Sequence, residues 1–215
     1  MSSMKTFVIA MDCEAEAVTR HLAEPREETL YGRRVVRGTL NGEDTAVIVS
    51  GIGKGNAAAA TQLALQLSGG APVMNIGVVG AVDDSMSVGD LFEVSAAVQY
   101  DFDLTAINGT EMGTLNERTS PYIPCAAAGR LPAKILGSGD RFNDSAEDNA
   151  LLRRLGIGIR DMEGGAIAHV CELAGVPCSM WKCVSDVYGS GATPGQYKEN
   201  LATCIERLAA FAATL

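Results

Sequence analysis

The sequence predicts an α/β protein: a single domain in which one twisted, mixed β-sheet is flanked by helices. Short apolar runs rich in β-branched residues alternate along the chain with segments whose apolar residues recur at helical spacing. Because several runs are apolar throughout, they are typical of strands covered on both faces. The 215 residues, 47% of them hydrophobic, suit one domain spanning 1–215, with two small domains as the alternative.

The N-terminal part of the chain predicts a strand, a helix and a hairpin. Residues 5–11 are short, apolar and β-branched, which predicts a buried strand, and 13–24 place apolar side chains at helical spacing. The Asn-Gly pair at 41–42 supplies the positive φ angles of a tight turn, so we expect 33–40 and 45–50 to form a hairpin.

The middle of the chain begins with a glycine-rich corner, GIGKGN at 51–56, which leads into an alanine-rich helix at 57–67. Residues 71–82 form another apolar strand candidate, and 90–104 form an extended run with partial alternation. The stretch 106–130 is rich in Gly, Thr, Asn and Pro, which predicts a long loop.

The C-terminal part returns to a regular alternation of strands and helices. Gly175 is expected to end one helix, and Pro194 lies near the first turn of the last one, which spans about 20 residues. In order, we expect a strand and loop at 133–140, a helix at 145–155, a strand at 156–162, a helix at 164–175, a strand at 177–186 and a helix at 193–215.

Charge and composition argue against several classes of protein. The net charge is −9, and the 17 basic residues are scattered among 26 acidic ones, which argues against a nucleic-acid partner. No apolar run approaches the roughly 18 residues of a membrane span, and the N-terminus lacks the features of a signal peptide. The six cysteines form no CxxC pair and there are only two histidines, so we expect no structural zinc, and reduced thiols in a cytoplasmic protein.

In a sheet of this kind, ligands bind beyond the carboxyl ends of the strands. The chain segments that follow or close the expected strands therefore define the candidate site. They are Met11–Glu14, Gly77–Ala81, Ser138–Phe142, Asp161–Glu163 and Ser185–Asp186.

Several residues in these segments have an ordinary structural interpretation beside a functional one. Glu14 and Glu163 lie near helix starts, where acids balance the helix dipole, and Asp186 is placed to cap a turn. A carboxylate at the end of an apolar strand is costly unless it is paired or functional, and the two glycines after Glu163 indicate a close approach of the backbone to another group. Phe142 either stacks on a planar ligand or anchors its loop. The two histidines, His21 and His169, are expected to pack rather than catalyse.

The GIGKGN corner is similar to a phosphate-binding loop without matching one. Glycines before a helix let backbone N–H groups approach an anion. Lys54 is followed by Gly55, so the Walker pattern fails, and the glycine spacing does not fit the dinucleotide fingerprint. A tight strand-to-helix corner is the alternative.

Seven segments, in chain order, resemble the purine nucleoside phosphorylase/nucleosidase superfamily, and most closely its 5'-methylthioadenosine/S-adenosylhomocysteine nucleosidases. They are AMDCEAEA, SGIGKGNAAAA, NIGVVGAV, VGDLFEVSAAVQYDFDLTA, SGDRFND, RDMEGGAIAHV and VSDVYG. Each segment is weak alone, but the ordered set spans roughly residues 5–213 and is specific at the level of the superfamily.

The resemblance implies a role for each matching position. Glu14 would be the general base that activates the attacking water, and Asp186 the acid that protonates N7 of the departing adenine. Met162 and Glu163 would bind the ribose hydroxyls. The other implied substrate-binding positions are Phe142 and the backbone of Asn143 at the base, Met11, Ile52 and Leu104 around the ribose and 5' group, and Val78 and Ser185 in the strand-end segments.

The resemblance therefore implies hydrolysis of the N-glycosidic bond of an adenosine-like nucleoside, with no metal or cofactor. It also implies a homodimer in which segment 100–120 completes a neighbour's pocket. The sequence departs from the family pattern at Val78, usually serine, at Lys182, usually arginine, and throughout 107–122. Asn75 stands where phosphorylases carry a phosphate-binding arginine, which favours water as the nucleophile. The alternatives are a purine nucleoside phosphorylase, a nucleosidase for another 5'-modified nucleoside such as futalosine, and a nucleoside-binding protein without catalysis.

Overall fold

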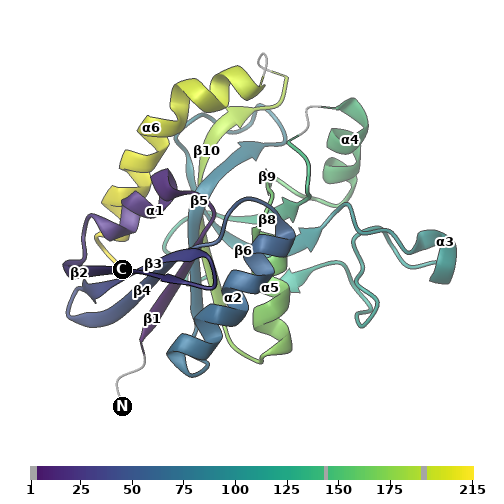
Figure 1. Ribbon diagram of the computed structural model, residues 1–215. Coiled ribbons are helices and arrows are strands. Elements are labelled where there is room, and N and C mark those ends of the chain that lie inside the picture. The colour runs from purple at the N-terminus through teal and green to yellow at the C-terminus, as the bar shows by residue number, and fades with distance from the viewer. Residues whose placement is uncertain (1–3, 143–144, 190–192) are drawn as a thin grey trace.

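The computed structural model describes residues 4–142, 145–189 and 193–215. Strands and helices alternate along the chain, and the helices lie against both faces of the sheet (Figure 1). In order the elements are β1 (Lys5–Ile9), α1 (Asp12–Thr19), β2 (Ala23–Leu30), β3 (Arg33–Leu40), β4 (Glu43–Val49), α2 (Lys54–Ser68), β5 (Val73–Ala81), β6 (Leu91–Gln99), α3 (Thr105–Asn108), β7 (Ile123–Pro124), β8 (Ala133–Ser138), α4 (Ala146–Arg154), β9 (Ile159–Asp161), α5 (Gly164–Leu173), β10 (Cys178–Val187) and α6 (Thr193–Ala212).

The sheet is mixed, which confirms the predicted fold class. Its strands follow the order β10-β6-β8-β9-β5-β1-β4-β3-β2, and β7 pairs with β6. Strands β1, β4, β5 and β10 run parallel, whereas β2–β3, β3–β4, β5–β9 and β6–β10 are antiparallel pairs. Because β10 pairs with β5 as well as with β6, the strands β5, β10, β6, β8 and β9 close into a ring.

The core lies on both faces of the central strands, as a continuously apolar strand requires. In β1, Val8 belongs to the apolar cluster beneath α2 and α5, while Phe7 and Ile9 belong to the cluster beneath α1 and α6. All three side chains are fully buried. This alternation explains why Phe7, Val8 and Ile9 are all apolar.

The expected helix at 13–24 was too long. Helix α1 ends at Thr19, and residues 23–30 form an edge strand that pairs with β3. The sequence of β2, AEPREETL, is exposed along almost its whole length and therefore lacks the apolar alternation that identifies a half-buried strand. The hairpin that follows is confirmed, with positive φ at Asn41 and Gly42 in its turn.

The expected loop at 106–130 is largely irregular, but two short elements interrupt it. Residues 105–108 form the single turn of α3, and β7 adds two residues to the edge of β6. In Figure 1, α3 stands away from the body of the molecule.

None of the helices in the described ranges combines the length and the apolar character needed to cross a membrane.

Candidate active site

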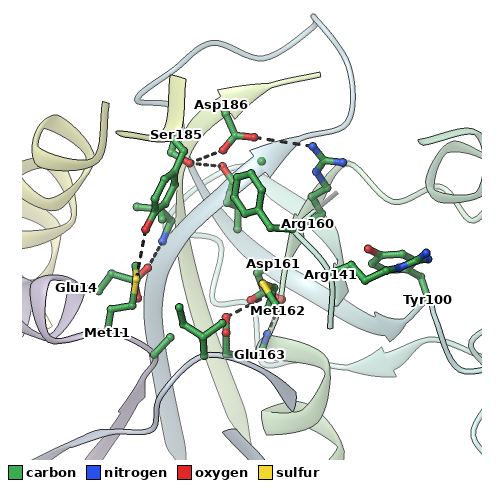
Figure 2. A pocket seen from close by; sticks show the side chains of 17 residues that line it. Met11, Glu14, Tyr100, Arg141, Arg160, Asp161, Met162, Glu163, Ser185 and Asp186 are labelled. Carbon is green, nitrogen blue, oxygen red and sulfur yellow. Dashed lines mark hydrogen bonds and ion pairs between the residues drawn. The ribbon is translucent and has the colours of Figure 1, made fainter. Parts of the chain in front are cut away.

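A cavity of about 380 Å³ opens at the carboxyl ends of the strands, within the size range of small-molecule sites (Figure 2). All five predicted segments contribute to it. Its lining comprises Ala10, Met11, Glu14, Ile52, Val78, Val79, Gly80, Tyr100, Arg141, Phe142, Arg160, Asp161, Met162, Glu163, Ser185, Asp186 and Tyr197.

Glu14 projects into this cavity from the first turn of α1 and is 3% exposed. Its Oε1 accepts a hydrogen bond of 2.8 Å from the backbone N–H of Val78, whereas the buried Oε2 has no hydrogen-bond partner among the described residues. Burial raises the pKa of Glu14 to about 7, although the Val78 N–H and the Lys182 charge oppose the rise. A carboxylate with a pKa near neutrality and one uncommitted oxygen is suited to general-base catalysis.

Asp161, which lines the cavity, forms an ion pair of 2.8 Å with Lys182, and both side chains are 2% exposed. Asp161 also accepts hydrogen bonds from Ser138 Oγ and from the backbone N–H groups of Glu163 and Gly164. Asp161 therefore holds the backbone at the start of α5, whose N-cap residue is Glu163. This separates the two acids of the DME segment, because Asp161 has the structural role at the helix start and Glu163 is left to the cavity.

Glu163 is 8% exposed and spans the gap between α5 and the glycine-rich corner. Its Oε1 accepts a hydrogen bond of 2.8 Å from Gly53 N–H, and its Oε2 one of 3.3 Å from Met162 N–H. Burial, and next the Asp161 charge, raise the pKa of Glu163 to about 7. Its carboxylate is thus held at the N-terminus of α2 and lines the same cavity as Glu14.

The two glycines after Glu163 allow close packing between α5 and the sheet. A Cβ on Gly164 would lie 2.3 Å from Leu136 Cδ2, and one on Gly165 would lie 3.0 Å from Gln99 Cγ. The close approach expected from the sequence therefore exists, but its partners are β8 and β6 rather than a ligand.

Asp186 is 2% exposed and lies at the end of β10. Its Oδ1 accepts a hydrogen bond of 2.7 Å from Ser185 Oγ, and its Oδ2 lies 4.0 Å from Arg160 Nη2. A register shift between Val184 and Asp186 marks an irregularity in the pairing of β10 with β5 at this position.

Aromatic side chains border the cavity mouth. Phe142 is 53% exposed and packs edge-on against Tyr197, with ring centroids 5.7 Å apart. The Tyr197 hydroxyl donates a hydrogen bond of 3.3 Å to Met11 Sδ. Burial, and then the Glu14 charge, raise the pKa of Tyr197 to about 12, so the phenol stays protonated.

One residue expected at the site, Leu104, is not among the described residues that line this cavity. Leu104 is half-buried immediately before α3, on the segment that stands away from the body, and does not line the cavity. Asn143 lies outside the described residues. Met11, Ile52, Val78, Met162 and Ser185 all line the cavity.

The glycine-rich corner is held by carboxylates of the chain itself. Gly53 N–H donates to Glu163, Lys54 N–H donates to Asp140 Oδ1, and Lys54 Nζ pairs with Asp101. The N–H groups of Gly53 and Lys54, at the start of α2, are therefore engaged by carboxylates of the chain, and the corner interpretation describes the loop better.

The histidines and Asn75 have structural partners. His21 Nε2 lies 2.9 Å from the Ala209 carbonyl, and His169 pairs with Glu117. Asn75 Nδ2 donates to the Val8 carbonyl at 2.8 Å. None of the three lines the cavity.

Tyr100, Arg160 and Tyr197 line the cavity although they lie outside the segments expected from the sequence, and Arg141 lies within one of those segments but was given no role there. For Arg160 a signal existed, because a charged residue inside a short apolar strand is costly unless it is paired or functional, as was argued for Asp186. Tyr197 gave no such signal, because it is one polar-tipped residue near the start of a long amphipathic helix.

A family model described as the phosphorylase superfamily matches residues 6–215. The chain belongs to this superfamily. A 5'-methylthioadenosine/S-adenosylhomocysteine nucleosidase of Halalkalibacterium halodurans is 35% identical to this chain over 198 residues. The match covers 85% of this chain and 85% of that nucleosidase.

Solved structures of other proteins share the fold. A 5'-methylthioadenosine/S-adenosylhomocysteine nucleosidase of Colwellia psychrerythraea, in complex with adenine, has a TM-score of 0.87 and 26% identity, covering 100% of this chain and 96% of its own. A futalosine hydrolase of Helicobacter pylori has a TM-score of 0.91 at 23% identity, covering 100% and 98%. At that identity, the likeness to the futalosine hydrolase shows the fold alone.

The buried carboxylate of Glu14 makes the stability of the protein depend on pH. Its pKa is about 7 in the folded state and 4.5 without the protein environment, so the folded form is favoured below pH 4.5 and loses that advantage as the pH rises through 7. Glu14→Gln, which imitates the protonated form, should match the wild type near pH 4.5. Above pH 7 it should exceed the wild type in free energy of unfolding by an amount on the order of 3 kcal/mol.

Urea denaturation at several pH values measures this difference. Glu16→Gln is the matched control, because Glu16 lies on the same helix with its side chain 63% exposed and should give a nearly constant difference. A stability difference for Glu14→Gln that does not change with pH would contradict the raised pKa.

Proposed function

We propose that the chain hydrolyses the N-glycosidic bond of an adenosine-like nucleoside, of the 5'-methylthioadenosine or S-adenosylhomocysteine type, to adenine and a 5'-modified ribose. One observation carries the proposal: Glu14, Glu163 and Asp186, from three separate elements, face a single cavity of nucleoside size. The relatives that are named as nucleosidases of this type support it.

The proposed reaction uses each carboxylate differently. Glu14 accepts a proton from the attacking water, and the water oxygen forms a bond to C1' of the ribose. The C1'–N9 bond breaks and its electron pair stays with the base, which takes a proton at N7 from Asp186 and leaves neutral. Glu163 binds the ribose hydroxyls, and the negative charge around the sugar stabilises an oxocarbenium-like transition state.

The hydrogen bonds described above fit these roles. Ser185 donates a hydrogen bond to one oxygen of Asp186, whose side chain lines the cavity, and the Val78 N–H donates one to an oxygen of Glu14. Val78 therefore contributes a backbone donor, although its side chain lacks the hydroxyl of the family's usual serine. The retained backbone contact argues against the alternative of a binding protein without catalysis.

Water is favoured over phosphate as the nucleophile. Lys182, a buried cation whose charge acts on Glu14, is already paired with Asp161, and Asn75 is hydrogen-bonded to the β1 backbone. A phosphate near C1' would also meet the charges of Glu14 and Glu163, which repel a second anion. We therefore propose a hydrolase rather than a phosphorylase.

An assay of base release over a panel of nucleosides tests the proposal. Purified protein should release adenine from 5'-methylthioadenosine at the same rate with and without added phosphate. Glu14→Gln and Asp186→Asn should each lower kcat by about 10²-fold or more while the circular dichroism spectrum stays that of the wild type. Release that requires phosphate would replace the hydrolase by a phosphorylase, and wild-type rates in both variants would contradict the mechanism.

We further propose that the active form is a homodimer in which segment 100–120 of one copy completes the pocket of the other. Leu104 does not reach its own cavity, Ile107 on α3 is 81% exposed, and Ile52 at the cavity edge is 52% exposed. Exposed apolar residues of this size are typical of contact surfaces.

Light scattering tests the proposed assembly. The 22.4 kDa chain should behave as a particle of about twice that mass, and Ile107→Asp should shift it towards the monomer and lower kcat/KM. Tyr31→Asp is the control, because Tyr31 is equally exposed (85%) on the hairpin at the opposite end of the sheet order. A fully active monomeric wild type would contradict this proposal.

A further inference from the structure

A bulge near the end of β10 decides on which face of the sheet Asp186 lies. Val184 pairs with Val79 of β5, and the next pair is Asp186 with Gly80. Ser185 is therefore the extra residue of the bulge. Because side chains alternate between the two faces along a strand, one extra residue moves every later side chain to the other face.

The packing of β10 shows this change of face. Cys183 belongs to the apolar cluster beneath α1 and α6, and Val184 to the cluster beneath α2 and α5. Strict alternation would return Val187 to the first cluster, yet it belongs to the second. Asp186 therefore lies on the face of α1 and α6. Its partner Gly80 leaves it room there, because a Cβ on that glycine would lie 2.8 Å from Asp186 Oδ2.

Helix α6 packs along β10 and hydrogen-bonds to the backbone around the bulge through side chains one turn apart (Figure 1). Side chains four residues apart share one face of a helix. The contacts are Gln196 Oε1 with the Val187 N–H at 3.1 Å, Asn200 Nδ2 with the Ser185 carbonyl at 3.0 Å, and Cys204 Sγ with the Val184 carbonyl at 3.2 Å. Of the three, Asn200 is the one that binds the bulged residue itself.

Ser185 connects Asn200 to the proposed acid. Its carbonyl accepts the hydrogen bond of Asn200, and its hydroxyl donates one of 2.7 Å to Asp186 Oδ1. Ser185 and Asp186 are buried, whereas Asn200 is half-buried. Asn200 is not among the described residues that line the cavity. Any effect of Asn200 on a bound nucleoside therefore passes through the backbone of β10.

We propose that Asn200 is a positioning residue for Asp186: its hydrogen bond to the Ser185 carbonyl holds the bulge of β10 in the register that presents the Asp186 carboxyl to the cavity. The inference rests on the proposed function, in which Asp186 protonates the departing base. A proton donor must lie within hydrogen-bond reach of N7, and a displacement of about 1 Å costs up to about a hundredfold in rate. Loss of the Asn200 donor therefore slows bond cleavage rather than weakening nucleoside binding.

A double-mutant cycle separates this role from a merely structural one. Asn200→Leu removes the donor and keeps a side chain of similar size. In the wild-type background it should lower kcat for adenine release from 5'-methylthioadenosine about tenfold and leave KM within about twofold. In the Asp186→Asn background the same substitution should lower kcat by less than about twofold, because the group that Asn200 positions no longer acts as an acid.

Two further variants and a structure serve as controls. Asn200→Asp keeps the shape of the side chain but presents an ionised carboxylate, which has no donor, to the Ser185 carbonyl, so it should lower kcat at least as much. Glu199→Leu places the same new side chain at the exposed neighbouring position of α6 and should leave kcat unchanged. A crystal structure of Asn200→Leu gives a readout that does not depend on activity, and it should show the backbone of residues 185–186 displaced.

The outcomes distinguish this inference from the proposed function. Equal losses of kcat from Asn200→Leu in both backgrounds overturn the inference, because they assign Asn200 to the general packing of α6, and leave the proposed function standing. Wild-type kcat in Asn200→Leu or Asn200→Asp, or an undisplaced Asp186 in the crystal structure, overturns it in the same way. A wild-type rate in Asp186→Asn, or no release of adenine by the wild type, overturns the proposed function and the inference with it.

Discussion

The buried ion pair between Asp161 and Lys182 is the interaction on which the rest of the site depends. Its two charges lie 2.8 Å apart and out of contact with solvent. Burial disfavours the charged form of Lys182, but Asp161 and then Glu14 and Glu163 outweigh it and raise the lysine pKa above its usual range. Lysine therefore remains a cation in the interior because several carboxylates surround it.

The ion pair connects the position of each catalytic group to the fold. Asp161 accepts hydrogen bonds from the N–H groups of Glu163 and Gly164 at the start of α5, which fixes the position of Glu163. Glu163 in turn accepts a hydrogen bond from the Gly53 N–H, just before α2. On the other side, a Cβ on Gly77 would lie 2.9 Å from Glu14 Oε1 and 3.5 Å from Lys182 Nζ, which shows how closely β5 brings these groups together. The burial that raises the pKa values of Glu14 and Glu163 to about 7 costs folding stability and gives Glu14 its basicity near neutral pH.

The sequence alone predicts the fold and the location of the site well, because both depend on patterns that repeat along the chain. Apolar strands identify a sheet covered on both faces, and their carboxyl ends identify the cavity. What it misses depends on contacts between distant segments. Strand β2 has no buried face that a sequence pattern could reveal. Arg160 of β9 lies near Asp186 of β10 only because both residues pair with Gly80 of β5. Tyr197 reaches the cavity because α6 packs against β10, and no local sequence pattern predicts that packing.

The most direct test of this account is the effect of Lys182→Met on the free energy of unfolding, measured by urea denaturation at pH 7 together with kcat/KM. Removing one partner of a buried pair leaves Asp161 as an uncompensated charge, so the account predicts a loss of about 3–5 kcal/mol and a large fall in activity. Arg34→Met, which breaks pairs of the half-exposed Arg34 with Asp12 and Glu27, should cost under about 1 kcal/mol. A Lys182→Met variant as stable and active as Arg34→Met would contradict the account.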